Sequence, residues 1–223
     1  QIIDFVTTGA VAGCVNLPPL SAEAAREIGP WMPLMTALGK LAARLVPAPS
    51  RLDITYAGRT EALDPKPLTR LLTAAVLGSA SGRVTPVNAL AEAAARGLTV
   101  AETVGGDGDG FDRLLKLRIE GAQGVRELEA TLHRGPRVVR LDGVELDFDP
   151  SAHFLIMRNE DQPGVVGKLG TGLGEAGVNI INFSLGATGG GQAVAAITVD
   201  REVPEATLAR LRAIPGILSL EMV

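Results

Sequence analysis

The stretch from His153 to Ile181 constrains the fold of this chain most, because it sets out a strand, a loop, a helix and a second strand in order. His153 to Met157 is a short apolar run, which is typical of a buried strand. Arg158 to Gln162 is polar and charged, and Pro163-Gly164 then fixes a tight turn into the next helix. The stretch therefore predicts a module that combines helices with a sheet.

The predicted helix of this stretch has one apolar face. Val165, Leu169 and Leu173 recur at every fourth position, so their side chains form a single stripe. Ala176-Gly177 follows as a typical C-terminal stop, since glycine accepts the left-handed backbone that often ends a helix. We therefore expect this helix to pack on the neighbouring strands.

Residues 172–177 spell G-x-G-x-x-G, a pattern shared with dinucleotide-binding sites. In those sites the glycines lie between a strand and the helix that follows it, so that the helix N-terminus meets the pyrophosphate. Here the glycines lie late in a helix and a strand follows them. We therefore reject a nucleotide site and expect these small residues to allow close packing of the helix on the sheet.

This stretch resembles the start of an ACT domain, the amino-acid-sensing module. The resemblance rests on an acidic residue, a Pro-Gly pair that opens a helix, and a Gly-Val-Asn-Ile run at the next strand, which here are Asp161, Pro163-Gly164 and residues 177–180. Two strands around Gly189-Gly190-Gly191, a helix opened by Pro204 and a last strand complete the pattern. The resemblance implies the ferredoxin-like βαββαβ fold.

The preceding part of the chain has its own pattern of helices and strands. Helical periodicity covers residues 21–46, 67–77 and 85–96, where Val87, Leu90, Ala91 and Ala94 are the expected inward face of the third helix. From Leu98 to Phe148 the hydrophobic period falls to two, which is typical of strands. We expect a small α/β unit with a mostly antiparallel sheet, so that the fold class of the whole chain is α+β.

An acidic, glycine-rich segment at residues 105–110 lies between two of these predicted strands. Its recurring Asp residues suggest calcium, but the spacing lacks the full ligand set and the terminal Glu of an EF-hand. We therefore interpret it as the mobile tip of a hairpin.

Residues 1–20 resemble the tail of the catalytic half of 2-hydroxyacid dehydrogenases of the D-3-phosphoglycerate dehydrogenase type. With this tail, the whole chain resembles the regulatory half of that family: an intervening, or allosteric substrate-binding, domain at 21–150 and an ACT domain at 151–223. The catalytic and NAD-binding halves of the family are absent. The resemblance thus implies a regulatory fragment without a cofactor of its own, attached to an NAD-dependent parent enzyme in serine biosynthesis.

Charge and cysteine content exclude several classes of function. The net charge of −4 and the pI near 5.3 argue against a nucleic-acid surface. One cysteine, Cys14, allows no intrachain disulfide, no Cys-based zinc site and no iron–sulfur cluster. No run approaches the roughly 20 apolar residues of a membrane span. We expect a cytoplasmic protein that binds neither nucleic acid nor membrane.

The effector site follows from the ACT resemblance. In that family the effector serine lies between two ACT domains, at the loop after the first strand of one copy and the start of the second strand of the other. The implied residues here are Asn159, Asp161, Gly164, Val165 and Asn179. A zwitterionic amino acid suits them, because Asp161 takes its ammonium while Asn179 and the helix-start N–H groups take its carboxylate. The implied partners are L-serine or another small amino acid and a second ACT domain.

Other candidate residues have simpler explanations. Asp161 is otherwise a helix cap, and Asn179 otherwise shapes the start of a strand. Arg83, Arg134 and Arg137 lie beside Gly or Pro and form a candidate anion pocket, although solvated arginines are more common. We predict no catalytic residues and no metal ligands, since no Ser/His/Asp set and no paired carboxylates in the sequence suggest catalysis.

Two alternatives to a serine sensor stay open at this point. One is part of an iron–sulfur L-serine dehydratase, which the single cysteine disfavours. The other is an ACT module that only oligomerises and binds no effector. In either form we expect self-association, because the strand after Pro150 and the helix before Gly177 are apolar enough to leave a sheet edge or a helix face in need of cover.

Overall fold

The structure is a computed structural model that describes residues 26–59, 64–78 and 84–223. The predicted dehydrogenase tail at 1–20, with Cys14, lies outside these residues. Contacts divide the chain into two units: one runs to Arg126 and includes Thr131–Pro136, and the other holds Glu127–Ala130 and Arg137–Val223. The domain boundary at residue 150 stays a prediction of the sequence.

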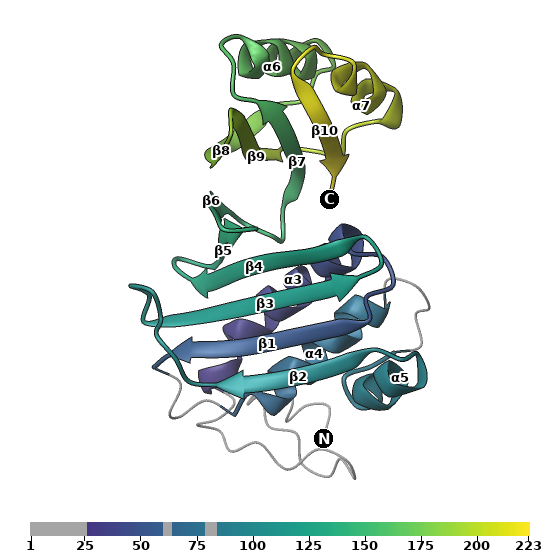
Figure 1. Ribbon diagram of the computed structural model, residues 1–223, viewed down its shortest axis with the longest axis vertical. Helices are drawn as coiled ribbons and strands as arrows, with labels where there is room; N and C mark the ends of the chain where they lie inside the picture. The colour runs from purple at the N-terminus through teal and green to yellow at the C-terminus, as the bar shows by residue number, and fades with distance from the viewer. Residues whose placement is uncertain (1–25, 60–63, 79–83) are drawn as a thin grey trace. The chain divides into compact units, whose positions relative to one another are not determined.

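The first unit places helices on one face of a mixed sheet (Figure 1). Its sheet begins β2-β1-β3-β4, in which β1 pairs parallel with β2 and antiparallel with β3. The buried side chains of β1 alternate with its polar ones and form the core with α3 and α4, as the period of two predicts. The elements are α3 (Trp31–Leu45), β1 (Arg51–Gly58), α4 (Lys66–Gly78), α5 (Ala89–Ala95), β2 (Thr99–Val104), β3 (Arg113–Gly121) and β4 (Gly124–Leu132).

The glycine-rich segment at 105–110 is not a hairpin tip. A hairpin would require β2 and β3 to be neighbours, but β1 lies between them in the sheet. The segment crosses the end of β1 and is bonded to it: Gly105 N–H donates to the Tyr56 carbonyl at 2.8 Å, and Gly58 N–H donates to the Gly106 carbonyl at 3.1 Å. The prediction was wrong because the partner of β2 comes from earlier in the chain.

The third helix also differs from its prediction. It begins at Ala89, because the Asn88 side chain accepts hydrogen bonds from the Thr85 N–H at 2.7 Å and hydroxyl at 3.0 Å and so holds a turn ahead of the helix. Ala89 and Ala93 face the core, whereas Val87 and Leu90 are exposed. The predicted inward face was therefore wrong.

The second unit contains the four-stranded sheet of the predicted βαββαβ module. The strand order is β10-β7-β9-β8, with every pair antiparallel, and α6 and α7 connect the strands. This order confirms the ferredoxin-like prediction and, with the mostly antiparallel first sheet, the α+β class. The elements are β5 (Pro136–Leu141), β6 (Val144–Phe148), β7 (His153–Glu160), α6 (Val165–Glu175), β8 (Ile180–Gly189), β9 (Gln192–Val199), α7 (Glu205–Arg212) and β10 (Ile217–Met222).

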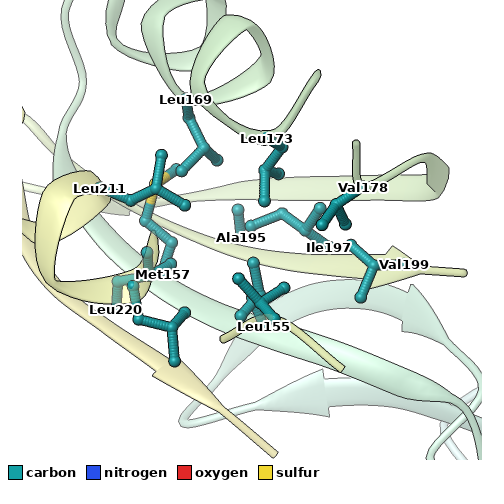
Figure 2. Packing of buried hydrophobic residues seen from close by; sticks show 12 residues of the cluster. Leu155, Met157, Leu169, Leu173, Val178, Ala195, Ile197, Val199, Leu211 and Leu220 are labelled. Carbon is teal, nitrogen blue, oxygen red and sulfur yellow. The ribbon is translucent and has the colours of Figure 1, made fainter. Parts of the chain in front are cut away.

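The helices of this unit bury one face of its sheet. Leu169 and Leu173 of α6 point at the strands and meet Ala195 and Ile197 of β9, while Leu211 of α7 packs above Met157 of β7 (Figure 2). The apolar stripe predicted for α6 is confirmed, since Val165, Leu169 and Leu173 are its buried residues.

The other face of this sheet is covered by the β5–β6 hairpin. The rings of Phe148 and Phe154 lie with centroids 4.8 Å apart, and Gly186 of β8 leaves room for the hairpin because a Cβ there would lie 2.7 Å from the Glu145 carbonyl. This cover explains why β7 is apolar at consecutive positions: Phe154 and Leu155 are both buried, although they face opposite sides.

The misplaced G-x-G-x-x-G pattern packs one helix against another. A Cβ on Gly172 would lie 2.5 Å from Cδ2 of Leu211 in α7, so the close contact is with a helix and not with the sheet as expected. A Cβ on Gly174 would have no atom within 4 Å.

Two glycine-to-alanine changes in helices should have opposite effects on stability. Gly39 lies where a Cβ would be 2.5 Å from the Ala75 Cβ and 2.6 Å from the Leu72 carbonyl of α4, so Gly39→Ala should cost about 1–3 kcal/mol by overpacking. Gly174→Ala should stabilise its helix by about 0.5–1 kcal/mol, since alanine restricts the unfolded chain. Urea unfolding of both variants is the measurement, and a neutral Gly39→Ala would contradict the close packing of α3 on α4.

Candidate functional site

Three connections of the second unit meet where β7 ends. Glu160 N–H donates to the Gly216 carbonyl at 2.8 Å, ahead of β10, and Asp161 N–H donates to the Gly191 carbonyl at 2.8 Å, in the β8–β9 turn. The loop from β7 to α6 is thus held on both sides by backbone hydrogen bonds. The loop and the two element ends that it joins carry four of the five predicted effector residues: Asn159, Asp161, Gly164 and Val165.

Asn159 is the buried polar group of this end. Its residue is 2% exposed, and it lies between Ala193 of β9 and Ile217 of β10. The amide Nδ2 donates to the Glu160 carbonyl at 2.7 Å, but Oδ1 is buried and has no hydrogen-bond partner in the part of the chain that the structure describes. Such an orphaned acceptor costs about 1–3 kcal/mol, so it marks a place where a donor is missing.

Asp161 and the start of α6 follow this buried amide directly along the chain. The helix is capped by Gly164, whose φ of +92° favours glycine, and the Asp161 carboxylate makes no hydrogen bond with any residue that the structure describes. Asp161 therefore does not act as a helix cap here. Gly164 N–H likewise has no acceptor within the described ranges, whereas Val165 N–H donates to the Gln162 carbonyl in a long hydrogen bond of 3.5 Å. The loop thus presents an exposed carboxylate beside backbone donors.

Asn179 precedes β8 and has a different environment. Its N–H donates to Asp200 Oδ1 at 3.0 Å, and its carbonyl accepts from the Asp200 N–H at 3.0 Å. The Asp200 pKa is lowered, first by the hydrogen bond from Arg201 and then by the one from the Asn179 N–H. The Asn179 residue is exposed, so its side chain is accessible at the surface.

The two halves of the predicted site lie at opposite ends of the sheet. Along β9, Asn159 pairs with Ala193, whereas Ile180, the residue after Asn179, pairs with Val199. Six residues of strand separate these positions, which corresponds to roughly 20 Å at about 3.4 Å per residue. One copy of the chain cannot bring Asp161 and Asn179 to the same small amino acid.

The predicted anion pocket is only partly described. Arg83 lies outside the described residues. Arg134 is exposed in the turn before β5 with a φ of +55°, and Arg137 Nε donates to Asp147 Oδ1 at 2.6 Å. The pocket stays a prediction.

The same described ranges offer neither a cluster of metal ligands nor a helix that could cross a membrane. No group of three or more His, Cys, Asp or Glu residues there is placed to hold a metal ion, and both His133 and His153 are exposed. None of the described helices has the length and apolar content to span a membrane.

Sequence reasoning missed the residues that attach the β5–β6 hairpin to the sheet. Arg158 of β7 pairs with Asp142 in the hairpin turn at 2.7 Å. Ser184 Oγ accepts from the Asp147 N–H at 2.8 Å, and Asn182 Nδ2 donates to the Asp147 carbonyl at 2.9 Å. The Asp-Gly turn was visible in the sequence, but no local signal indicated its partners.

This geometry defines a βαββαβ module that follows an α/β domain. Comparison with protein families agrees with both parts: residues 27–142 match the D-3-phosphoglycerate dehydrogenase intervening domain, and residues 153–216 match the ACT domain. The chain therefore belongs to the family of D-3-phosphoglycerate dehydrogenase intervening domains and carries an ACT domain after it.

Curated relatives extend the match over the chain. D-3-phosphoglycerate dehydrogenase of Bacillus subtilis (strain 168) is 25% identical over 228 residues, covering 100% of this chain and 43% of the relative. The enzyme of Mycobacterium tuberculosis (strain ATCC 25618 / H37Rv) is 34% identical over 209 residues, covering 88% of this chain and 39% of the relative. That of Synechocystis is 29% identical over 225 residues, covering 97% and 40%. The chain thus spans about two fifths of the length of the relatives it matches.

Proposed function

We propose that this chain is the regulatory part of a D-3-phosphoglycerate dehydrogenase and that its ACT domain binds L-serine for feedback control. The observation that carries the proposal is the buried Asn159 amide, whose Oδ1 lacks a donor in the described structure. An exposed carboxylate, Asp161, and the start of α6 follow it directly along the chain. A ligand that supplies hydrogen-bond donors and a negative group would satisfy all three features.

A free amino acid has the required groups in one small molecule. Its ammonium donates to the Asp161 carboxylate and to Asn159 Oδ1, and its carboxylate accepts from the Gly164 and Val165 N–H groups. A serine hydroxyl adds one more donor and acceptor. Asn179 is the other proposed partner of the amino acid's carboxylate. It must come from a second copy of the chain, because it lies at the far end of the sheet.

The sheet edges suggest how two copies meet. The sequence pointed to the strand after Pro150, but β7 lies between β9 and β10, so the edge strands are β8 and β10. Ile181 and Leu185 on β8 are large exposed apolar residues. In an antiparallel pair of β8 strands related by a two-fold axis, the start of one strand meets the end of the other, which brings Asn179 to the partner's half of the site.

Calorimetry of the chain against a panel of free amino acids tests this function, with light scattering as a parallel measure of mass. We expect a dimer that binds L-serine. Ile181→Lys places a charge on an edge residue that is 64% exposed and should raise the dimer dissociation constant at least tenfold (about 1.4 kcal/mol). L-serine binding should weaken with it.

Leu218→Lys on β10 is the matched control, because Leu218 is 50% exposed on the opposite edge of the same sheet. It should leave both mass and binding unchanged. A wild-type chain that is monomeric at high micromolar concentration, or that binds no amino acid, would overturn the proposed sensor.

The parent activity is the second part of the proposal. The matched relatives are named D-3-phosphoglycerate dehydrogenases, which supports an attached NAD-dependent enzyme over the iron–sulfur L-serine dehydratase. NAD, the catalytic residues and the cytoplasmic location belong to that proposed parent. An ACT module that only oligomerises would show the dimer without the heat of L-serine binding.

A further inference from the structure

We propose that Asp142, in the turn of the β5–β6 hairpin, couples the ligand-binding end of β7 to strand β4. The coupling itself is a property of the free chain, and its use in regulation rests on the amino-acid site proposed above. Asp142 and Gly143 have φ angles of +51° and +79°, which is the two-residue turn that Asp-Gly favours in tight hairpins.

The Asp142 carboxylate joins two strands with its two oxygens. Oδ2 accepts from the Arg158 guanidinium of β7 at 2.7 Å, and Oδ1 accepts from the Glu127 N–H of β4 at 3.0 Å. The Asp142 N–H in turn donates to the Glu127 carbonyl at 2.8 Å. A charged, two-sided hydrogen bond of this kind is stronger and more directional than a neutral one.

Arg158 is the residue before Asn159, but the two side chains lie on opposite faces of the sheet. Leu155 and Met157 face the helices, so strand alternation places Asn159 with them and Arg158 on the hairpin side. A ligand on the helix side that forms a hydrogen bond with the Asn159 amide therefore shifts the backbone of Asn159, which is covalently joined to Arg158. It does not touch Arg158 itself.

The hairpin is also attached beside the other half of the proposed site. Asn182 and Ser184, shortly after Asn179, hold the backbone of Asp147 at 2.9 and 2.8 Å. Gly186 lets the hairpin lie close to β8, as described above. Strand β7, which carries Asn159, and strand β8, which begins directly after Asn179, thus hold the same hairpin.

Strand β4, to which Asp142 is hydrogen-bonded, contains the boundaries between the two units. Glu127–Ala130 of β4 belong to the second unit, while the residues on both sides belong to the first. A second ion pair, Arg140 Nη1 with Glu129 Oε2 at 2.6 Å, joins the hairpin to the same four residues. Displacement of the hairpin therefore reaches a segment that is covalently continuous with the first unit.

Hydrogen exchange of single amides, followed by NMR on the whole chain without ligand, tests the coupling. Arg158→Met removes the guanidinium and leaves the turn and the proposed amino-acid site intact. The Glu127 and Asp142 amides should then exchange about three- to tenfold faster, because the carboxylate that orders them loses its partner. Arg158→Lys keeps the charge and should restore part of the protection.

Arg51→Met is the matched control. Arg51 pairs with Asp53 at 2.7 Å, with side chains 46% and 28% exposed, compared with 39% and 23% for Arg158 and Asp142. It should leave the Glu127 and Asp142 amides unchanged. Unchanged exchange in Arg158→Met, or equal acceleration in Arg51→Met, would overturn the coupling.

The same exchange measurement with L-serine added distinguishes a failure of this inference from a failure of the proposed function. In the wild type, L-serine should slow exchange of the Glu127 amide, whereas in Arg158→Met it should bind within about threefold of the wild-type Kd without that slowing. Faster exchange in the ligand-free variant together with no heat of L-serine binding in the wild type would refute the sensor and leave the coupling standing. L-serine protection of Glu127 that persists in Arg158→Met would refute the coupling as the regulatory path.

Discussion

Asp161→Ala should weaken L-serine binding by about thirtyfold to several-thousandfold. In the proposed site the Asp161 carboxylate faces the ligand ammonium between two copies, and leaving such a charge unpaired costs about 2–5 kcal/mol. The free chain should lose little stability, because this carboxylate makes no hydrogen bond with the described residues and Gly164, not Asp161, caps α6. Calorimetry gives the affinity, and thermal melts of both proteins with and without L-serine give the stability.

Glu160→Ala is the control for this substitution. Glu160 is the neighbouring exposed carboxylate at the end of β7, so its removal changes the net charge equally. It should alter L-serine binding by less than about threefold, as is usual for a charge screened by solvent. A melting temperature that L-serine raises equally in wild type and Asp161→Ala would move the site elsewhere in the chain.

The module after residue 150 was predictable because each of its elements carries its own period. The stripe of Val165, Leu169 and Leu173 faces the sheet as expected, and Pro204 lies at the cap of α7. The Asp142-Gly143 turn also follows from local chemistry, since both residues adopt positive φ. Strong local signals thus suffice where neighbours in sequence are also neighbours in space.

The first unit was harder to predict where contacts are non-local. The parallel pairing of β1 with β2 joins Arg51 to Thr99, and no turn signal links such distant residues. An alanine-rich helix gives a weak face, so its buried Ala89 and Ala93 were hidden behind the larger Val87 and Leu90. In each case tertiary packing decided between patterns that the local sequence left nearly equal.

The candidate site shows the same limit. The resemblance to ACT domains identified the loop after β7, but the burial of Asn159 depends on Ala193 and Ile217, which lie on two other strands. The approach of Arg158 to Asp142 depends likewise on the hairpin covering the sheet. The residue types were readable from the sequence, whereas the missing partner of Oδ1 was visible only in the fold.

Asn159→Val should separate ligand binding from stability. Valine suits a strand and removes the buried Oδ1, whose lack of a partner costs about 1–3 kcal/mol, along with one hydrogen bond worth about 0.5–1.5 kcal/mol. The free energy of unfolding of the ligand-free chain should therefore stay within about 1 kcal/mol or rise. L-serine affinity should fall about tenfold to 150-fold, because a hydrogen bond to a charged ammonium contributes about 1.5–3 kcal/mol.

Thr131→Val is the contrasting control, since Thr131 is also buried in a strand but its Oγ1 donates to the Arg113 carbonyl at 2.6 Å. It should lower the free energy of unfolding by about 1 kcal/mol and leave L-serine binding unchanged. Opposite results from urea unfolding, with Asn159→Val clearly less stable than Thr131→Val, would mean that Asn159 already contributes its full stabilisation without a ligand. A polar group that lowers stability in the free chain and raises affinity in the complex is what a binding site requires, because the fold forgoes a hydrogen bond that the ligand later supplies.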